Sequence, residues 1–160
     1  MFSRSLSSKA LRPLLGRYTV IPYDIFRVQS GSQVALRDFQ VQKRLGRRSY
    51  DLHVGPGGMV QPSIGDKLQG PNGCSVRPKG LNLDEIVDNF PGSDILIYRL
   101  EEGIQLPDDL VLLHEHTDHH ALQCATPMTL KSLNQKLTDL FATRAECMSR
   151  EDYFARYGSV

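Results

Sequence analysis

The sequence contains no tryptophan, only three cysteines, and no apolar run that approaches the length of a membrane span. The odd number of cysteines and the lack of a Cys-x-x-Cys pair exclude a disulfide framework and favour a reducing compartment. Without a run of about 18 apolar residues we expect no transmembrane helix and no membrane partner. At 160 residues, the chain has the length of a domain that can bury a hydrophobic core without disulfides.

Charge is nearly balanced over the whole chain, with 19 basic and 18 acidic side chains, but it is unevenly distributed. Residues 1–50 contain ten basic and two acidic side chains, whereas the remainder contains nine basic and sixteen acidic side chains. A basic half of this kind predicts either a targeting segment or a face that binds anions.

The first 17 residues, MFSRSLSSKALRPLLGR, differ in composition from the rest. They contain four basic residues, four serines and no acid, and an apolar residue recurs at every fourth position from Phe2 to Leu14. This composition is typical of a mitochondrial presequence, and the alternative is a basic tail on a cytoplasmic protein. We therefore divide the chain into a basic segment, 1–17, and a folded domain, 18–160.

Hydrophobic periodicity predicts short strands and a few helices, and therefore an α+β fold. Strands are expected at 18–29, 49–54, 94–100, 110–116 and 120–124. Helices are expected at 33–46, at 81–90, from an N-cap at Thr126 through Leu140, and after a cap at Ser149. Residues 55–80 contain seven glycines and four prolines, which excludes a long regular element there.

Four of the five histidines lie within residues 114–120, with the sequence HEHTDHH. The spacing His-x-His-x-Asp-His resembles the metallo-β-lactamase signature, so a zinc hydrolase that uses residues 114–119 is one alternative. Only forty residues follow this cluster and none is histidine, so we expect no metal. On a strand, His114, His116 and Asp118 would share one face, while the consecutive residues His119 and His120 would point oppositely.

Four segments share their order and spacing with a known family: DIFRVQ (24–29), GPNGCSVRP (70–78), LPDDLVLL (106–113) and HHALQCATPM (119–128). Over residues 18–142 the chain resembles the ADP-ribosyltransferase-like toxins of the type VI secretion exported toxin two family. The resemblance implies a mono-ADP-ribosyltransferase-like fold of split antiparallel sheets with flanking helices and NAD in the cleft. It also implies an unknown protein or nucleic-acid acceptor and an antitoxin or immunity protein as partners.

The resemblance further implies which residues act on NAD. Arg27 stands at the family's first-strand arginine, Ser75 at the serine of its central motif, and His119 at its functional histidine. Cys74 replaces a threonine beside the motif serine, and Gln123 stands nearest to the late-strand glutamate of many such enzymes, which this chain lacks there. We expect His119 and Ser75 to be catalytic, and all five residues to bind NAD.

Those residue types suit the chemistry of a dinucleotide. The guanidinium of Arg27 can bind phosphate or ribose oxygens, and the hydroxyl of Ser75 can both donate and accept a hydrogen bond. The imidazole of His119 can transfer protons near neutral pH.

Two further functions remain compatible with the sequence. In the first, the basic helix expected at 33–46 and the cations near its end would suit an RNA-directed protein of the same fold. These cations are Lys43, Arg44, Arg47 and Arg48, and no aromatic residue is interleaved with them. In the second, the chain is an interaction domain without enzymatic activity.

Overall fold

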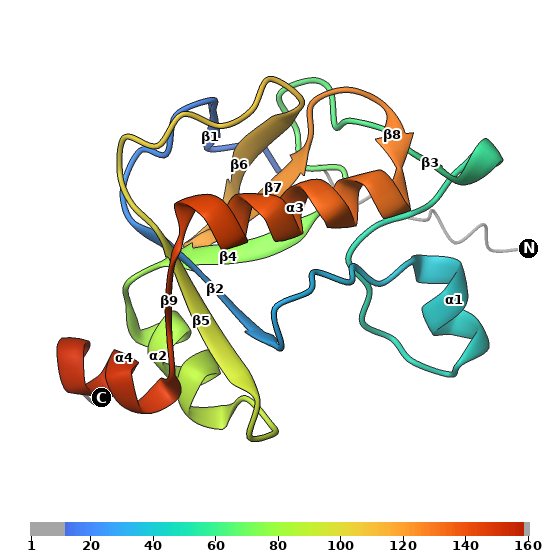
Figure 1. The fold of residues 1–160 in the computed structure, drawn as a ribbon. Coiled ribbons are helices and arrows are strands. Elements are labelled where there is room, and N and C mark those ends of the chain that lie inside the picture. Colours follow the sequence, from blue (N-terminus) through green and yellow to red (C-terminus); the bar gives the residue numbers. More distant parts are fainter. Residues whose placement is uncertain (1–11, 159–160) are drawn as a thin grey trace, which may run out of the picture.

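The computed structural model describes residues 12–158, which form a seven-stranded antiparallel sheet, a two-stranded sheet and four α-helices (Figure 1). The order of the strands in the large sheet is β1 (Gly16–Tyr18), β6 (Leu110–His116), β7 (His119–Cys124), β4 (Cys74–Pro78), β2 (Ile25–Ser30), β5 (Ile95–Leu100) and β9 (Glu146–Met148). The small sheet pairs β3 (Met59–Val60) with β8 (Met128–Thr129).

The large sheet splits between β4 and β2. The first three residues of β4 pair with β7, whereas only its last two residues pair with β2. Six residues of β2 then pair with β5, so that β2 and β5 diverge from β4 (Figure 1). Ser75 lies where the two halves begin to separate. The arrangement confirms the predicted α+β fold of split antiparallel sheets with flanking helices.

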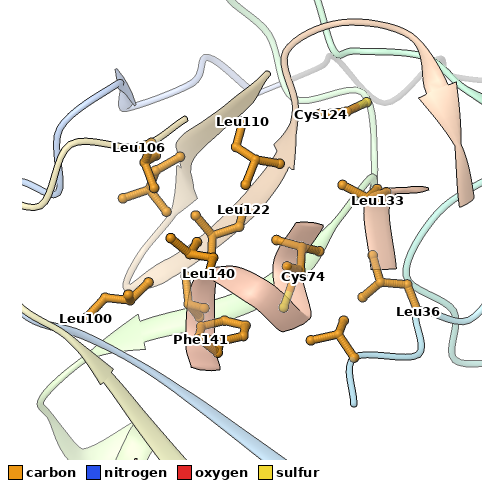
Figure 2. Packing of buried hydrophobic residues seen from close by; sticks show 14 of the residues in the cluster. Leu36, Cys74, Leu100, Leu106, Leu110, Leu122, Cys124, Leu133, Leu140 and Phe141 are labelled. Carbon is orange, nitrogen blue, oxygen red and sulfur yellow. The ribbon is translucent and has the colours of Figure 1, made fainter. Parts of the chain in front are cut away.

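Two hydrophobic cores pack against the sheet, and the larger one also includes Ile25 of β2 and Tyr98 and Leu100 of β5. The helix α3 (Leu130–Arg144) covers the half that contains β6, β7 and β4, and Figure 2 shows its Leu140 and Phe141 near Leu122 and Cys74. The helices α2 (Leu81–Asn89) and α4 (Arg150–Tyr157) cover the other half. Their core residues are Phe26, Val28, Leu83, Val87, Ile95, Ile97, Met148 and Tyr153.

Several predicted elements are confirmed and several are wrong. Strands and helices with strong local patterns form as predicted, including the helix that Ser149 caps by accepting from Asp152 N. The strand expected at 18–29 is divided into β1 and β2, and 49–54 forms only one isolated bridge, from Leu52 to Asp38.

The helix expected at 33–46 is restricted to α1 (Phe39–Arg44). Residues before it are extended because Val34 and Leu36 are buried, and their N–H groups donate to Thr138 and Asn134 of α3. The helix α3 begins at Leu130 and not after Thr126, because Met128 and Thr129 pair with β3.

Residues 12–17 of the basic N-terminal segment contribute to this fold. Gly16 pairs with His114 through β1, and Leu14 N donates to Asp66 O. Residues 1–11 and 159–160 lie outside the described part of the chain, so the division at residue 17 stays a prediction. No helix among the described residues is long and apolar enough to cross a membrane.

Candidate active site at the split of the sheet

Ser75 and His119 are brought together by the pairing of β4 with β7. Ser75 lies opposite Ala121, and His119 lies two residues before Ala121 on the same face of β7. Ser75 Oγ is 3.1 Å from His119 Nε2, which is hydrogen-bonding distance. The structure therefore joins the two residues predicted to be catalytic, although they are 44 positions apart in the sequence.

Arg27 of β2 lies at the split of the sheet, where β2 diverges from β4. Its Nη1 donates to the carbonyl oxygen of Ser75 at 3.1 Å, and its Nε donates to Gln29 Oε1 at 3.1 Å. Gln29 is buried and is itself held by a hydrogen bond to Gly31 O. A charged side chain thus replaces the missing backbone partner of Ser75 and is held in one position beside it.

Glu115 is a buried carboxylate behind His119. It is 2% exposed, and its Oε1 lies 3.0 Å from His119 Nδ1. The contact is close enough for an ion pair but lacks the alignment of a hydrogen bond, and Nδ1 has no hydrogen-bond partner among the described residues. A carboxylate at this distance favours the tautomer with the proton on Nδ1, so that Nε2 accepts from the Ser75 hydroxyl.

The sequence-based prediction did not assign Glu115 to His119. The contact depends on the turn between β6 and β7 and on the burial of the carboxylate, neither of which a short motif reveals. The available signal was a lone glutamate four residues before His119 within an apolar strand.

Two cavities of about 160 Å³ flank Ser75. One of them contains His119 and Glu115, and its complete lining is Arg37, Tyr50, Asp51, Pro71, Asn72, Gly73, Ser75, Glu115, His119 and Ala121. The other lies on the side of Arg27 and α2. A larger cavity of about 450 Å³ lies near Arg17 and contains none of the predicted site residues. Because the smaller cavities contain the residues predicted to be catalytic, we place the candidate site there.

Cys74 is not brought to this site. Successive residues of a strand point to opposite faces, so Ser75 faces the cavity while Cys74 faces the core. Cys74 is fully buried near Leu122, Leu140 and Phe141 (Figure 2). Burial also raises the pKa of its thiol, which disfavours the thiolate.

Gln123 lies on the same face as His119 but beneath the loop that leads into β4. It is 1% exposed, its Oε1 accepts from Asn72 Nδ2 at 3.3 Å, and its Nε2 has no hydrogen-bond partner among residues 12–158. Gly73 permits this close approach, since a Cβ there would lie 2.3 Å from the carbonyl oxygen of Leu122. Gln123 does not line the cavity of Ser75 and His119.

The histidine cluster lies on a hairpin, in which β6 and β7 are joined by a turn at Thr117. Thr117 adopts a positive φ of 44° in that turn, and the two strands agree with those expected at 110–116 and 120–124 rather than with one continuous strand. The rings of His114 and His120 stack with centroids 4.0 Å apart, and those of His116 and His119 with centroids 5.1 Å apart. Across the described chain, no group of three His, Cys, Asp or Glu residues is placed to hold a metal ion.

His120 is fully engaged by the fold. Its Nδ1–H donates to Asp118 O at 2.8 Å, and its Nε2 accepts from the hydroxyl of Tyr23. Burial is the main cause that lowers the pKa of His120 to about 4. It is therefore a neutral, hydrogen-bonded residue, in contrast to its neighbour in the cavity.

Comparisons with curated proteins and with solved structures gave no match. A family model described as Tse2 ADP-ribosyltransferase toxin matches residues 23–153. The match spans both halves of the split sheet and includes Arg27, Ser75, Glu115 and His119. The chain therefore belongs to the Tse2 ADP-ribosyltransferase toxin family.

Proposed function

We propose that this protein cleaves the nicotinamide–ribose bond of NAD and transfers ADP-ribose to an acceptor, which makes it toxic to a cell that lacks an immunity protein. One observation carries the proposal: Ser75, His119 and Arg27 converge from three strands at the split of the sheet. Membership of an ADP-ribosyltransferase toxin family supports the same reaction class.

The residues at the site fit a dinucleotide in chemistry. Arg27 can offer its guanidinium to phosphate or ribose oxygens, and Ser75 can hydrogen-bond a ribose hydroxyl or an amide. The cavity beside His119 measures about 160 Å³, which is smaller than the roughly 300–1,000 Å³ that is typical of small-molecule pockets. Only one end of NAD would therefore fit there, and the rest would extend beyond the cavity.

Each residue of the candidate site would have a separate role in the reaction. Glu115 fixes the orientation and tautomer of His119, and His119 Nε2 accepts the proton of Ser75 or of an acceptor hydroxyl. Arg27 holds the backbone of Ser75 in place and adds positive charge for the substrate's phosphates. NAD supplies the bond that is cleaved, and nicotinamide leaves as a neutral molecule.

The test is release of nicotinamide from NAD by the purified full chain, since β1 already begins at Gly16. Ser75→Ala and His119→Ala should each lower the rate by about 10²- to 10³-fold while the protein stays folded. Ser132→Ala, which changes an exposed serine on α3, is the matched control and should retain the full rate. Equal rates in all four folded proteins would refute the assignment of the site.

Expression in a host cell gives an independent readout. The wild-type chain should stop growth, and the Ser75→Ala and His119→Ala variants should not. Undiminished toxicity of both variants, at equal protein levels, would show that the toxicity does not depend on these residues.

A further inference from the structure

The segment around α1 carries a concentrated positive charge. Residues 39–48 contain four cations and no acid, whereas residues 51–160 contain nine basic and sixteen acidic side chains. All four cations are exposed, and none has an ion-pair or hydrogen-bond partner for its side chain among residues 12–158. They are Lys43, Arg44, Arg47 and Arg48. These charges are therefore available to an anionic partner.

Three aromatic rings cluster with one another at the start of α1 and shortly after the last of these cations in the chain. Phe39 at the start of α1 contacts His53 with ring centroids 4.6 Å apart, and Tyr50 contacts both rings at 4.9 and 5.0 Å. His53 is exposed, and the other two rings are half-buried. We call the four cations and these three rings the α1 surface. No aromatic residue is interleaved with the four cations in the sequence, but the fold gathers three rings at the two ends of this segment, because residues 50 and 53 fold back against residue 39.

The α1 surface continues into the candidate active site. Tyr50 lines the same cavity as Ser75 and His119, and Arg37 lines it as well. Arg37 is held by two hydrogen bonds of 2.9 Å to the carboxylate of Asp51, which also lines the cavity. A second cavity of about 310 Å³ adjoins it through Pro71 and Asn72 and is lined by His53.

We infer that the α1 surface binds the acceptor of the reaction, and that this acceptor is single-stranded nucleic acid. Non-specific binding of single strands combines cations that track phosphates with aromatic rings on which bases stack. An acidic protein would use the cations, but it would gain little from the three clustered rings. The identity of the reaction rests on the proposed function, whereas the binding does not.

The transfer would join nucleic acid to ADP-ribose at the cavity. A hydroxyl oxygen of the nucleic acid forms a bond to the ribose carbon that carried nicotinamide. The carbon–nitrogen bond to nicotinamide breaks, and nicotinamide leaves with the electron pair. The proton of the hydroxyl passes to His119 and then to water, so that no other reactant is needed.

Binding is tested with the full chain and a fluorescent twelve-nucleotide oligoadenylate, titrated at several salt concentrations. Arg47→Ala/Arg48→Ala should weaken binding about tenfold or more and lower the salt slope by about 1.4, since each phosphate contact to a single strand contributes about 0.7. Lys131→Ala/Arg144→Ala removes two exposed cations from α3 and should change neither quantity. Equal weakening by both double variants, or no binding by wild type at low salt, would overturn the inference.

The rings distinguish nucleic acid from other polyanions. His53→Ala should weaken binding of oligoadenylate several-fold, because a stacked base contributes about 1–3 kcal/mol, but it should leave binding of polyglutamate unchanged. If polyglutamate binds as tightly as oligoadenylate and responds equally to His53→Ala, the partner is an acidic protein and the inference is wrong.

Transfer is followed with NAD labelled in its adenosine part and a mixture of cellular RNA and protein. The inference expects the label in material that nuclease digests and protease does not. Label only in protein, with nicotinamide released, would refute the nucleic-acid acceptor and leave the proposed function intact. If oligoadenylate binds but no nicotinamide is released with RNA present, the proposed function fails while the α1 surface remains a nucleic-acid binding site.

Discussion

His119 and His120 are neighbours in the sequence, yet they lie on opposite faces of β7 in different surroundings. His120 is 1% exposed, and both of its ring nitrogens are hydrogen-bonded within the fold. His119 faces a cavity, with Nε2 beside Ser75 and Nδ1 beside the carboxylate of Glu115. An imidazole ring whose two nitrogens are both hydrogen-bonded within the fold contributes to stability. A ring that faces a cavity and a buried carboxylate can exchange protons with a ligand.

The residues of β4 likewise differ between the face that packs in the core and the face that lines the cavity. Cys74 packs against the core beneath α3, and Ser75, one residue later, faces the cavity. One face of these paired strands therefore holds the fold together and the other holds the polar groups of the site. Substitutions can separate the two faces, because they should change stability on one and activity on the other.

The largest effect is expected at Gly73, which directly precedes β4 and packs against the backbone of β7. Gly73→Ala would place a methyl group 2.3 Å from the carbonyl oxygen of Leu122, and backbone must move to relieve it. We expect the free energy of unfolding to fall by about 3 kcal/mol, and nicotinamide release to be lost with it. Denaturant unfolding measures the first effect. Gly80→Ala, where no atom lies within 4 Å of the added Cβ, is the control.

His120 should make the stability of the fold depend on pH. Its pKa is about 4 in the folded chain and 6.5 in the unfolded chain, so the unfolded state binds more protons between these values. Stability is therefore lost as pH falls from about 6.5 to 4, by on the order of 3 kcal/mol. Unfolding of wild type and His120→Gln should be compared across this range. An identical pH dependence in both would contradict the assignment.

Glu115 should affect activity and spare stability. Glu115→Gln keeps the shape of the side chain but removes the charge that holds His119 in one tautomer, so kcat should fall about tenfold with little change in KM. A neutral amide costs less to bury than a carboxylate, so the fold should not be destabilised, and thermal unfolding checks this. The ring nitrogens of His119, observed by NMR, should change tautomer in the variant. Unchanged nitrogen signals would show that Glu115 does not position the ring.

The smallest effect is expected on the core face of β4. Cys74→Ala removes a fully buried sulfur and should lower the free energy of unfolding by about 1 kcal/mol. Nicotinamide release should stay within about twofold of wild type. A loss of activity larger than the loss of folded protein would return Cys74 to the site, as the sequence first suggested.

Elements with a complete local pattern could be predicted from the sequence. The helix α4 has a serine cap and acids in its first turn, and β6 and β7 are apolar runs of strand length. The predictions failed where distant contacts decide the backbone. Residues 33–38 have a helical composition, but burial of Val34 and Leu36 against α3 keeps them extended.

The candidate site was predictable only in part, because some of its contacts join residues that are distant in the sequence. Arg27, Ser75 and His119 could be placed by resemblance, and the structure joins them by hydrogen bonds. The partner of His119 could not be found, because it depends on the register of a hairpin. The α1 surface was missed since its rings come together only when residue 50 folds back onto residue 39.

The three residues of β1 cover the outer edge of β6 and so protect it from pairing with another molecule. β1 occupies the outer side of β6, whose residues Leu110 to Leu113 are all buried. A proteolytic cut that removed residues up to Tyr18 would turn β6 into an apolar edge strand with unpaired backbone groups. The shortened protein would then pair edge to edge and aggregate, so any maturation of the N-terminus that preserves solubility must cut before Gly16.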